Sequence, residues 1–389
     1  MIISKRICSK LFLLLWTLIM VSCSKPKLIP YGSRIIDVPD WPMSGGTPQR
    51  TSYYPLSLEP PLELVWVEES SSAVGETIIV IDSIIYFGTL DGELNALAVS
   101  DGRRLSSKRF RYPPTPAYAN GNLIIALRFG ENTLFNINPG PGLQLSTIRW
   151  YQDAGDIQSE PLITPDGIVI TSLDNHIDLY SFENRVKLWT FTTDDQIHSS
   201  PTFANGAIIF GCDDGHVYSI DQTDGTLNWK VNAGASVQST ASYSVDLEMV
   251  FIGSSDNSLY ALDIDTGHII WKYETAGPLL NGIATDERHV IFGSTDRHLY
   301  CLDAASGEKR WTFKAKSVIS TNPIIAVDKV IFGSLDHFLY ILDIADGTML
   351  WNTELKGRIR TSPVIWSNLL ICASEDNHVY MFRESQKNN

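Results

Sequence analysis

The stretch at residues 253–271, GSSDNSLYALDIDTGHIIW, decides the fold, because the chain repeats it twice more. The second copy is GSTDRHLYCLDAASGEKRW at residues 293–311, and the third is GSLDHFLYILDIADGTMLW at residues 333–351. The copies start 40 residues apart. A fixed period of this length indicates an architecture of stacked repeats, so the chain length of 389 residues does not by itself predict several domains.

The aspartate at the fourth position of the phrase extends the series along the chain. In each copy an apolar run rich in β-formers, a two-residue reversal such as Asp256-Asn257, a second run such as LYALD and a turn ending in glycine predict four short antiparallel strands. A degenerate copy has Glu131 at the aspartate position, so the chain contains eight copies. The aspartates of the other seven are Asp91, Asp174, Asp214, Asp256, Asp296, Asp336 and Asp376.

One four-stranded sheet cannot bury both of its faces, so the copies must stack on one another. A closed ring gives every copy two neighbours and leaves no exposed end. We therefore predict an all-β protein, an eight-bladed β-propeller of four-stranded antiparallel blades. A tryptophan ends the repeated phrase, and we expect its indole to pack between adjacent blades at Trp66, Trp150, Trp189, Trp229, Trp271, Trp311 and Trp351.

The two ends of the repeat region complement each other. The last copy stops at Arg383, before its tryptophan strand, whereas Trp66 in LELVWVEE has no copy before it. We therefore expect an N-terminal strand that contains Trp66 to complete the last blade and close the ring.

The N-terminal 22 residues have the composition of an export signal. Three basic residues precede an apolar run at 11–21, which is too short to span a bilayer as a helix. The run ends in MVSC, which resembles the bacterial lipobox, so Cys23 is the expected lipidation site; an ordinary secretory signal cleaved near Ser22 is the alternative. Ser24, by resemblance to Gram-negative lipoproteins, implies a lipid anchor on the periplasmic side of the outer membrane.

These signals divide the chain into four parts. We expect a lipoprotein signal peptide at 1–22, a tether and N-terminal segment at 23–60, the propeller at 61–383 and a tail at 384–389.

Charge and cysteine content narrow the chemistry. The formal net charge is −14, which argues against a nucleic-acid partner, because binding phosphates needs clustered Lys and Arg. No CxxC or adjacent cysteine pair occurs, so structural zinc and haem attachment have no support. Cys212, Cys301 and Cys372 fall on three non-adjacent blades and are expected to be buried free thiols.

The repeated phrase, as at residues 293–311, resembles the tryptophan-docking repeat of the quinoprotein-dehydrogenase-like propellers, called PQQ-like repeats. The stretch DWPMSGGTPQRT at residues 40–51 also resembles the opening of many members of that family. The quinoprotein dehydrogenases hold their cofactor over the channel with a calcium ion, a catalytic Asp and a disulfide between adjacent cysteines. The chain has no adjacent cysteines and no recognisable set of calcium ligands, so we predict no cofactor, no metal and no enzymatic activity.

Three classes of function stay open. The first is a non-catalytic, membrane-anchored scaffold; resemblance to the lipidated single-propeller members of the family implies a role in outer-membrane protein assembly, with the barrel-assembly machinery as protein partner. The second is an exported recognition or sensor module for a small molecule, peptide or glycan. The third is a PQQ-dependent dehydrogenase.

The repeat register also predicts a candidate binding rim. Four polar residues are expected to meet at one mouth of the central channel, namely Gln158, His198, Gln238 and Arg360. Arg360 is the expected charged anchor for a carboxylate, because its guanidinium can pair with both oxygens.

Overall fold

The computed structural model describes residues 40–140, 143–183 and 186–385. The signal peptide, Cys23 and residues 24–39 of the segment at 23–60 therefore lie outside the described residues. Within the described ranges there is no helix long and apolar enough to cross a membrane.

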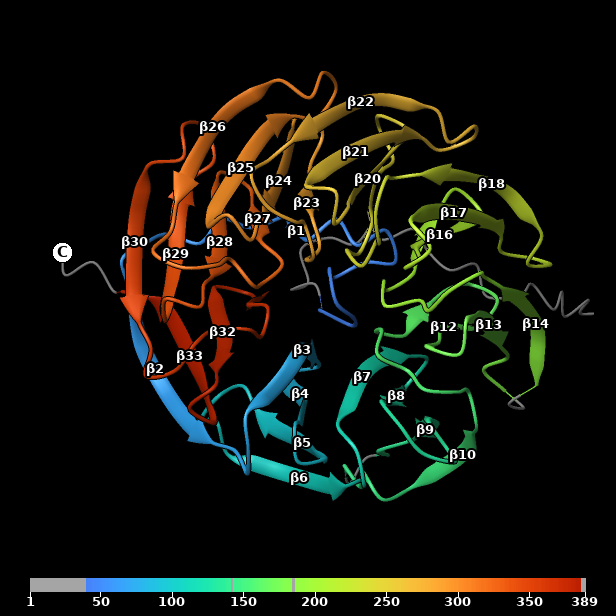
Figure 1. Cartoon of the computed structure of the whole chain (residues 1–389). Coiled ribbons are helices and arrows are strands. Elements are labelled where there is room, and N and C mark those ends of the chain that lie inside the picture. Colours follow the sequence, from blue (N-terminus) through green and yellow to red (C-terminus); the bar gives the residue numbers. More distant parts are fainter. Residues whose placement is uncertain (1–39, 141–142, 184–185, 386–389) are drawn as a thin grey trace, which may run out of the picture. The chain divides into compact units, whose positions relative to one another are not determined.

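The described chain is all-β, and its sheets follow one another around a ring (Figure 1). Blade 1 consists of β3 (Val74–Ile81), β4 (Ile84–Thr89), β5 (Glu93–Ala98) and β6 (Arg104–Arg109), and blade 2 of β7 (Pro114–Ala119), β8 (Asn122–Leu127), β9 (Leu134–Ile137) and β10 (Ile148–Gln152). Blade 3 consists of β11 (Leu162–Ile163), β12 (Ile168–Thr171), β13 (His176–Tyr180) and β14 (Lys187–Thr192), and blade 4 of β15 (Thr202–Ala204), β16 (Ala207–Gly211), β17 (His216–Asp221) and β18 (Leu227–Asn232).

The second half of the ring repeats the pattern with two additions from the N-terminal region. Blade 5 consists of β19 (Ser242–Ser244), β20 (Met249–Gly253), β21 (Ser258–Asp263) and β22 (Ile269–Glu274), and blade 6 of β23 (Ala284–Thr285), β24 (His289–Gly293), β25 (His298–Asp303) and β26 (Lys309–Lys314). Blade 7 consists of β27 (Ile324–Ala326), β28 (Lys329–Gly333), β29 (Phe338–Asp343) and β30 (Met349–Glu354), to which β1 (Tyr53–Tyr54) is added. Blade 8 consists of β31 (Val364–Trp366), β32 (Leu369–Ser374) and β33 (His378–Glu384), to which β2 (Leu62–Glu69) is added. The predicted eight-bladed propeller is confirmed.

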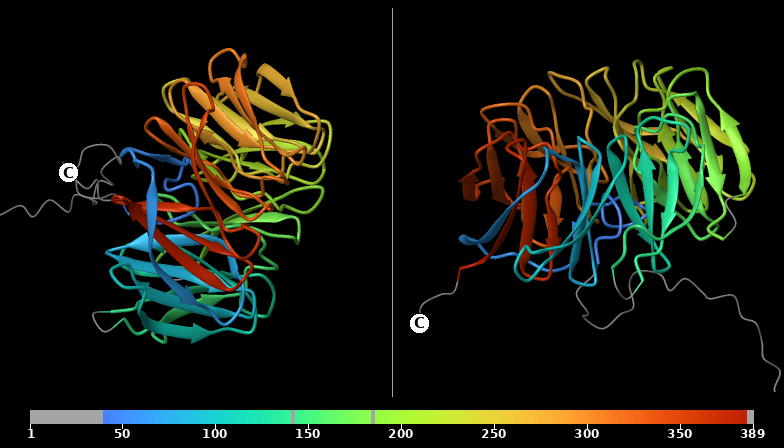
Figure 2. Two further views of the ribbon diagram at one scale, coloured as in Figure 1. Left: turned by 90° about the vertical axis from the view of Figure 1, so that its left-hand side faces the viewer. Right: turned by 90° about the horizontal axis from the view of Figure 1, so that it is seen from below.

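The ring closes as the sequence predicts. Strand β2 pairs antiparallel with β33 over their whole length, from Leu62 opposite Glu384 to Glu69 opposite His378. Figure 2 shows β2 in blue beside the red strands of the last blade. One blade differs from the prediction, because β1 pairs parallel to β27 and gives blade 7 a fifth strand.

Each blade buries apolar side chains between itself and its neighbours. The two middle strands are almost wholly buried, as in VIFG of β24, whereas the outer strands alternate between exposed and covered residues, as in KRWTFK of β26. Cys212, Cys301 and Cys372 lie in these buried layers as free thiols, which confirms that expectation. Burial raises the pKa of Cys212 to about 11 and that of Cys301 to about 12, so both thiols are unreactive at neutral pH.

The tryptophans of the outer strands contact the next blade. The Trp229 indole Nε1 donates a 2.8 Å hydrogen bond to the carbonyl of Ile264, and its ring lies against Gly267 in the same turn of blade 5. Trp66, Trp150, Trp189, Trp271 and Trp311 make the equivalent bond of 2.7–3.1 Å to the following blade. Trp351 instead packs edge-on against Phe382 of blade 8. Ser106 takes the tryptophan position of blade 1.

Deletion of residues 62–69 should lower the melting temperature by more than about 10 °C, because blade 8 loses its outer strand and the ring loses its closure. Deletion of residues 386–389 is the control and should change it by less than about 2 °C. Equal melting temperatures for the two truncations, measured by circular dichroism, would contradict closure by β2.

Trp229→Ala should cost about 3–5 kcal/mol of unfolding free energy, because a buried indole and its hydrogen bond are lost. Gly267→Ala should also destabilise, since Gly267 has φ +70° and an added Cβ would lie 2.7 Å from the indole ring. Gly206→Ala isolates the backbone cost of about 1–2 kcal/mol, because Gly206 has φ +81° but no atom within 4 Å of the added Cβ. If urea denaturation gave both glycine variants the same stability, contact with Trp229 would contribute nothing.

Candidate functional site

The central channel is the candidate functional site, and part of the chain itself lies in it. The first strand of each blade lines the channel and has no neighbour on its inner edge in its own blade, apart from β27. Residues 41–54, which we call the central segment, pass through the middle of the ring (Figure 1). The sequence assigns these residues to the stretch before the propeller, whereas the structure places them inside it.

The central segment hydrogen-bonds to the inner strands of six blades and to the turn after the inner strand of a seventh. Its carbonyl oxygens at Trp41, Pro42, Pro48, Gln49, Thr51 and Ser52 accept N–H donors from blades 1, 2, 4, 5, 6 and 7 at 2.9–3.0 Å. The hydroxyl of Tyr54 accepts the N–H of Ser367 in blade 8. Unpaired N–H groups on a buried strand edge are costly, so these bonds stabilise the inner wall of the ring.

Arg50 connects the central segment to the remaining blade. Its Nη2 donates to the carbonyls of Glu160 and Pro161 in blade 3, and its Nε donates to the carbonyl of Pro201 in blade 4. Its Nη1 lies 2.9 Å from Glu160 Oε2 and donates to the carbonyl of Ser44. The Arg50 side chain is only 2% exposed. Burial lowers its pKa, but an arginine remains charged because its ordinary pKa is above 12.

Glu160 therefore sits at a junction of three parts of the chain. One carboxylate oxygen binds Arg50, and the other accepts a hydrogen bond from the Thr77 hydroxyl of blade 1. Other copies have a small polar residue before the proline that precedes the inner strand, such as Ser200 or Ser362. The departure from that pattern at Glu160 supplies the counter-ion that the buried Arg50 requires.

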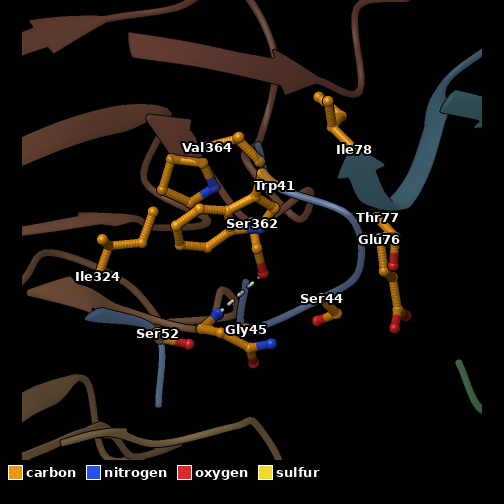
Figure 3. A pocket seen from close by; sticks show the side chains of 12 residues that line it. Trp41, Ser44, Gly45, Ser52, Glu76, Thr77, Ile78, Ile324, Ser362 and Val364 are labelled. Carbon is orange, nitrogen blue, oxygen red and sulfur yellow. Dashed lines mark hydrogen bonds between the residues drawn. The ribbon is translucent and has the colours of Figure 1, made fainter. Parts of the chain in front are cut away.

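A pocket remains between the central segment and the walls of blades 1, 7 and 8 (Figure 3). Ser44, Gly45 and Ser52 form its central side, while Glu76 and Ser362 belong to the wall. The Glu76 side chain is exposed to the channel, but protein atoms lie close around the channel at this point. Burial and the nearby charge of Glu160 raise its pKa, whereas the charges of Arg128 and Arg360 act in the opposite direction. The pocket is therefore lined by both polar and apolar side chains, and it contains a carboxyl group that gains a proton more readily than usual.

The four predicted rim residues occupy repeat-equivalent positions, each four residues before an inner strand, so they lie on one face of the ring. We call this face the mouth. Each of the four side chains contacts another residue of the chain. Gln158 accepts a bond from Arg128, and Arg360 donates a 2.6 Å bond to Glu375. His198 lies 2.8 Å from Asp213, which also accepts a bond from Gln238.

Sequence reasoning missed the residues that organise the channel. Arg50 lies in an irregular stretch, GGTPQRT, that has no counterpart in the repeats, and a buried arginine leaves no periodic pattern to detect. Asp213 and Glu375 occupy the same position of the repeat, because each directly precedes the aspartate of its copy, Asp214 or Asp376. A comparison of that position between copies would have identified both as partners for the rim.

Comparison with known proteins identifies the family. A family model described as "Outer membrane protein assembly factor BamB" matches residues 131–280 and 274–348, which is more than half of the chain. The chain belongs to this family of PQQ-like propellers. BamB of Shewanella oneidensis is 24% identical over 204 residues, and the match covers 48% of this chain and 48% of that protein. The chain thus matches about half the length of this curated relative.

Solved structures agree on the fold. BamB from Moraxella catarrhalis superimposes with a TM-score of 0.69 at 16% identity, over 83% of this chain and all of the other. The quinohemoprotein alcohol dehydrogenase of Comamonas testosteroni gives a TM-score of 0.75 at 12% identity, over 90% of this chain and 82% of that one. At these identities the likeness establishes the propeller fold alone.

The resemblance to dehydrogenases raises the question of whether the channel fits a quinone held by calcium. Calcium takes carboxylate and amide oxygens as ligands. Arg50 and Thr77 already occupy the Glu160 oxygens, and the Asn322 side-chain oxygen accepts the N–H of Gly282. Within the described ranges, no three His, Cys, Asp or Glu residues gather where they could hold a metal ion. The channel residues do not fit the group.

Arg50→Met should destabilise the protein by about 3 kcal/mol, because Glu160 loses its charge partner and four backbone carbonyls lose their donors. Arg50→Met combined with Glu160→Gln should recover part of this loss, since the uncompensated carboxylate is gone. Arg383→Met is the matched control: Arg383 pairs with Glu63 at 2.7 Å on the surface, and its loss should cost less than about 1 kcal/mol. Equal losses in urea denaturation for Arg50→Met and Arg383→Met would contradict the role of Arg50.

Proposed function

We propose that this chain is a non-catalytic, membrane-anchored scaffold that binds a protein partner. The observation that supports this proposal best is the occupation of the channel. Where a propeller enzyme needs room for cofactor and substrate, this chain packs Trp41 and the buried Arg50 against the inner strands. A ring tied at its centre offers its loops and its outer surface for contact, which suits a rigid protein that binds other proteins.

The proposal extends to outer-membrane protein assembly. The relatives carry that role in their name, outer membrane protein assembly factor BamB. By analogy, the partner is the barrel-assembly machinery, and the location is the periplasmic side of the outer membrane. The lipobox-like MVSC sequence supplies the anchor in this proposal, with Cys23 lipidated after removal of residues 1–22.

A recognition module for a small molecule, peptide or glycan is the second candidate. It is favoured by the polar mouth formed by Gln158, His198, Gln238 and Arg360. A ligand there would have to replace internal partners, because Arg360 pairs with Glu375 and His198 lies against Asp213. Arg360 is 52% exposed, so its exchange to a ligand carboxylate needs only a side-chain rotation.

Cys23→Ala should yield an exported protein that no longer sediments with membranes, because acylation of Cys23 would provide the main membrane affinity. Membrane fractionation in high salt, with Cys8→Ala as the control, measures this directly. A second measurement uses a strain that lacks the gene. The amount of folded outer-membrane barrel proteins should be lower in that strain and should recover when the wild-type chain is expressed, but not when the Cys23→Ala chain is expressed. Full recovery by Cys23→Ala, or unchanged barrel proteins without the gene, would count against the proposal.

The dehydrogenase alternative has a separate readout on the same purified protein. A quinone that bound with calcium would stabilise the native state by RT ln(1 + [L]/Kd), about 2.7 kcal/mol at a hundred times Kd. We expect no shift of the melting temperature with PQQ and calcium together. A shift of several degrees would contradict the scaffold proposal and favour the enzyme.

A further inference from the structure

The turns at the mouth follow one design in five blades. In each, an aspartate side chain accepts a hydrogen bond from the hydroxyl of a tyrosine four residues later, at 2.5–2.8 Å. The pairs are Asp214 with Tyr218, Asp256 with Tyr260, Asp296 with Tyr300, Asp336 with Tyr340 and Asp376 with Tyr380. Burial raises the pKa of Asp296, but the bonds from Tyr300 and the His298 N–H outweigh it, and the net pKa is lowered. The carboxylate is therefore committed to holding its own turn.

Blade 2 departs from this design. Phe135 pairs with Ile125 in β8 as Tyr218 pairs with Phe210 in β16, so a phenylalanine without a hydroxyl stands at the tyrosine position. The turn that precedes it contains Arg128 and Phe129, and both side chains are exposed. A turn released from the aspartate–tyrosine bond is free to display other residues.

The residues that blade 2 displays form a compact cluster, Arg111, Tyr112, Arg128 and Phe129, which we call the blade 2 corner. The rings of Tyr112 and Phe129 meet edge to face with centroids 5.8 Å apart. The Arg111 guanidinium lies 5.5 Å from the centre of the Tyr112 ring, and that of Arg128 lies 5.4 Å from the centre of Phe129. Both guanidinium groups lie over aromatic rings. Arg128 also donates a 2.8 Å bond to Gln158, and the remaining N–H groups of the two arginines can donate to a carboxylate.

An apolar surface adjoins these cations. Phe129 is 38% exposed and Leu90, on the neighbouring turn of blade 1, is 57% exposed. The turn that carries Leu90 is joined to the loop that carries Arg111 and Tyr112, because the Phe110 N–H donates a 2.8 Å bond to the carbonyl of Gly92. A ligand that contacts both arginines can therefore place an apolar side chain against Phe129 or Leu90.

The loops that lead into the inner strands differ in charge from blade to blade. Those of blades 3 and 4 carry Asp153, Asp156, Asp194 and Asp195, whereas those of blades 2, 7 and 8 carry Arg111, Lys316, Lys356, Arg358 and Arg360. The hairpin turns of the same face add acidic residues on both sides, among them Asp91, Glu131 and Glu375. An anionic lipid surface laid across this face would meet the four aspartates as well. A narrow ligand that contacts only the blade 2 corner avoids these four aspartates, so the charge pattern favours a peptide over a membrane.

We propose that the blade 2 corner binds an acidic segment of a protein partner, with carboxylates on Arg111 and Arg128 and an apolar side chain against Phe129 and Leu90. On a chain of net charge −14, this corner offers two arginines stacked on aromatic rings beside exposed apolar surface. The inference rests on the proposed function only in that the partner is a protein.

Fluorescence polarisation on the full-length protein in mild detergent tests this. The probe is a labelled peptide in which Glu-Asp pairs flank single Phe residues, and the reference is the same peptide with Lys in place of each acidic residue. The acidic peptide should bind, and more weakly as salt rises; the basic peptide should not. Arg111→Ser combined with Arg128→Ser should weaken binding at least ten-fold, and Phe129→Ala alone several-fold.

Lys230→Ser combined with Lys314→Ser is the matched control. It removes two cations, one of which lies 5.7 Å from the Tyr218 ring centre, and should leave peptide binding unchanged. If both double variants lost the same peptide affinity, the effect would come from the change in net charge, and the proposal would be overturned. Unchanged binding by the Arg111→Ser/Arg128→Ser protein, or binding of phosphatidylglycerol vesicles without the peptide, would overturn it too. Because no lipid anchor or outer-membrane readout enters this measurement, failure of the cellular role leaves its result interpretable.

Discussion

The structure depends on how a closed ring satisfies the inner edges of its blades. Every first strand ends its own sheet, so its N–H groups converge on the channel without partners from that sheet, apart from those of β27 that meet β1. The central segment solves this with irregular backbone, whose successive carbonyls point to different blades in turn. Arg50 completes the circuit where blade 3 presents carbonyls instead of a donor. The same solution occupies the space in which propeller enzymes place their chemistry.

The outer half of each blade follows another rule. Five contacts between blades pair a large indole with a glycine, as Trp229 with Gly267 and Trp311 with Gly347. The glycines have φ near +70°, and a Cβ at these positions would meet the ring. Turn conformation and blade packing thus both depend on this glycine, which explains why the phrase keeps it.

The fold was predictable from the sequence where the chain repeats, and the parts that could not be predicted are those where the repeat is lost. The period, the hairpin turns and the complementary ends at Trp66 and Arg383 were enough to predict eight blades and their closure. The central segment has no repeat partner, and its contacts link residues more than 100 positions apart, as Arg50 to Glu160. The rim positions followed from the register. Their partners Asp213 and Glu375 share one position of the repeat, but which rim residue each of them contacts depends on side-chain geometry that periodicity does not encode.

The position of the N-terminal region has a consequence for the order of folding. The four antiparallel strands of each of blades 1 to 7 are adjacent in sequence, so their hairpins can form as the chain emerges. Residues 41–69 behave differently, because they are made before all eight blades and yet contact every one of them, and β2 pairs with β33 more than 300 residues later. The segment synthesised early is therefore among the last to dock. Until β33 is available, the open arc exposes the apolar faces of its terminal blades, and the passage across a membrane that an export signal implies would have to take place before the ring can close.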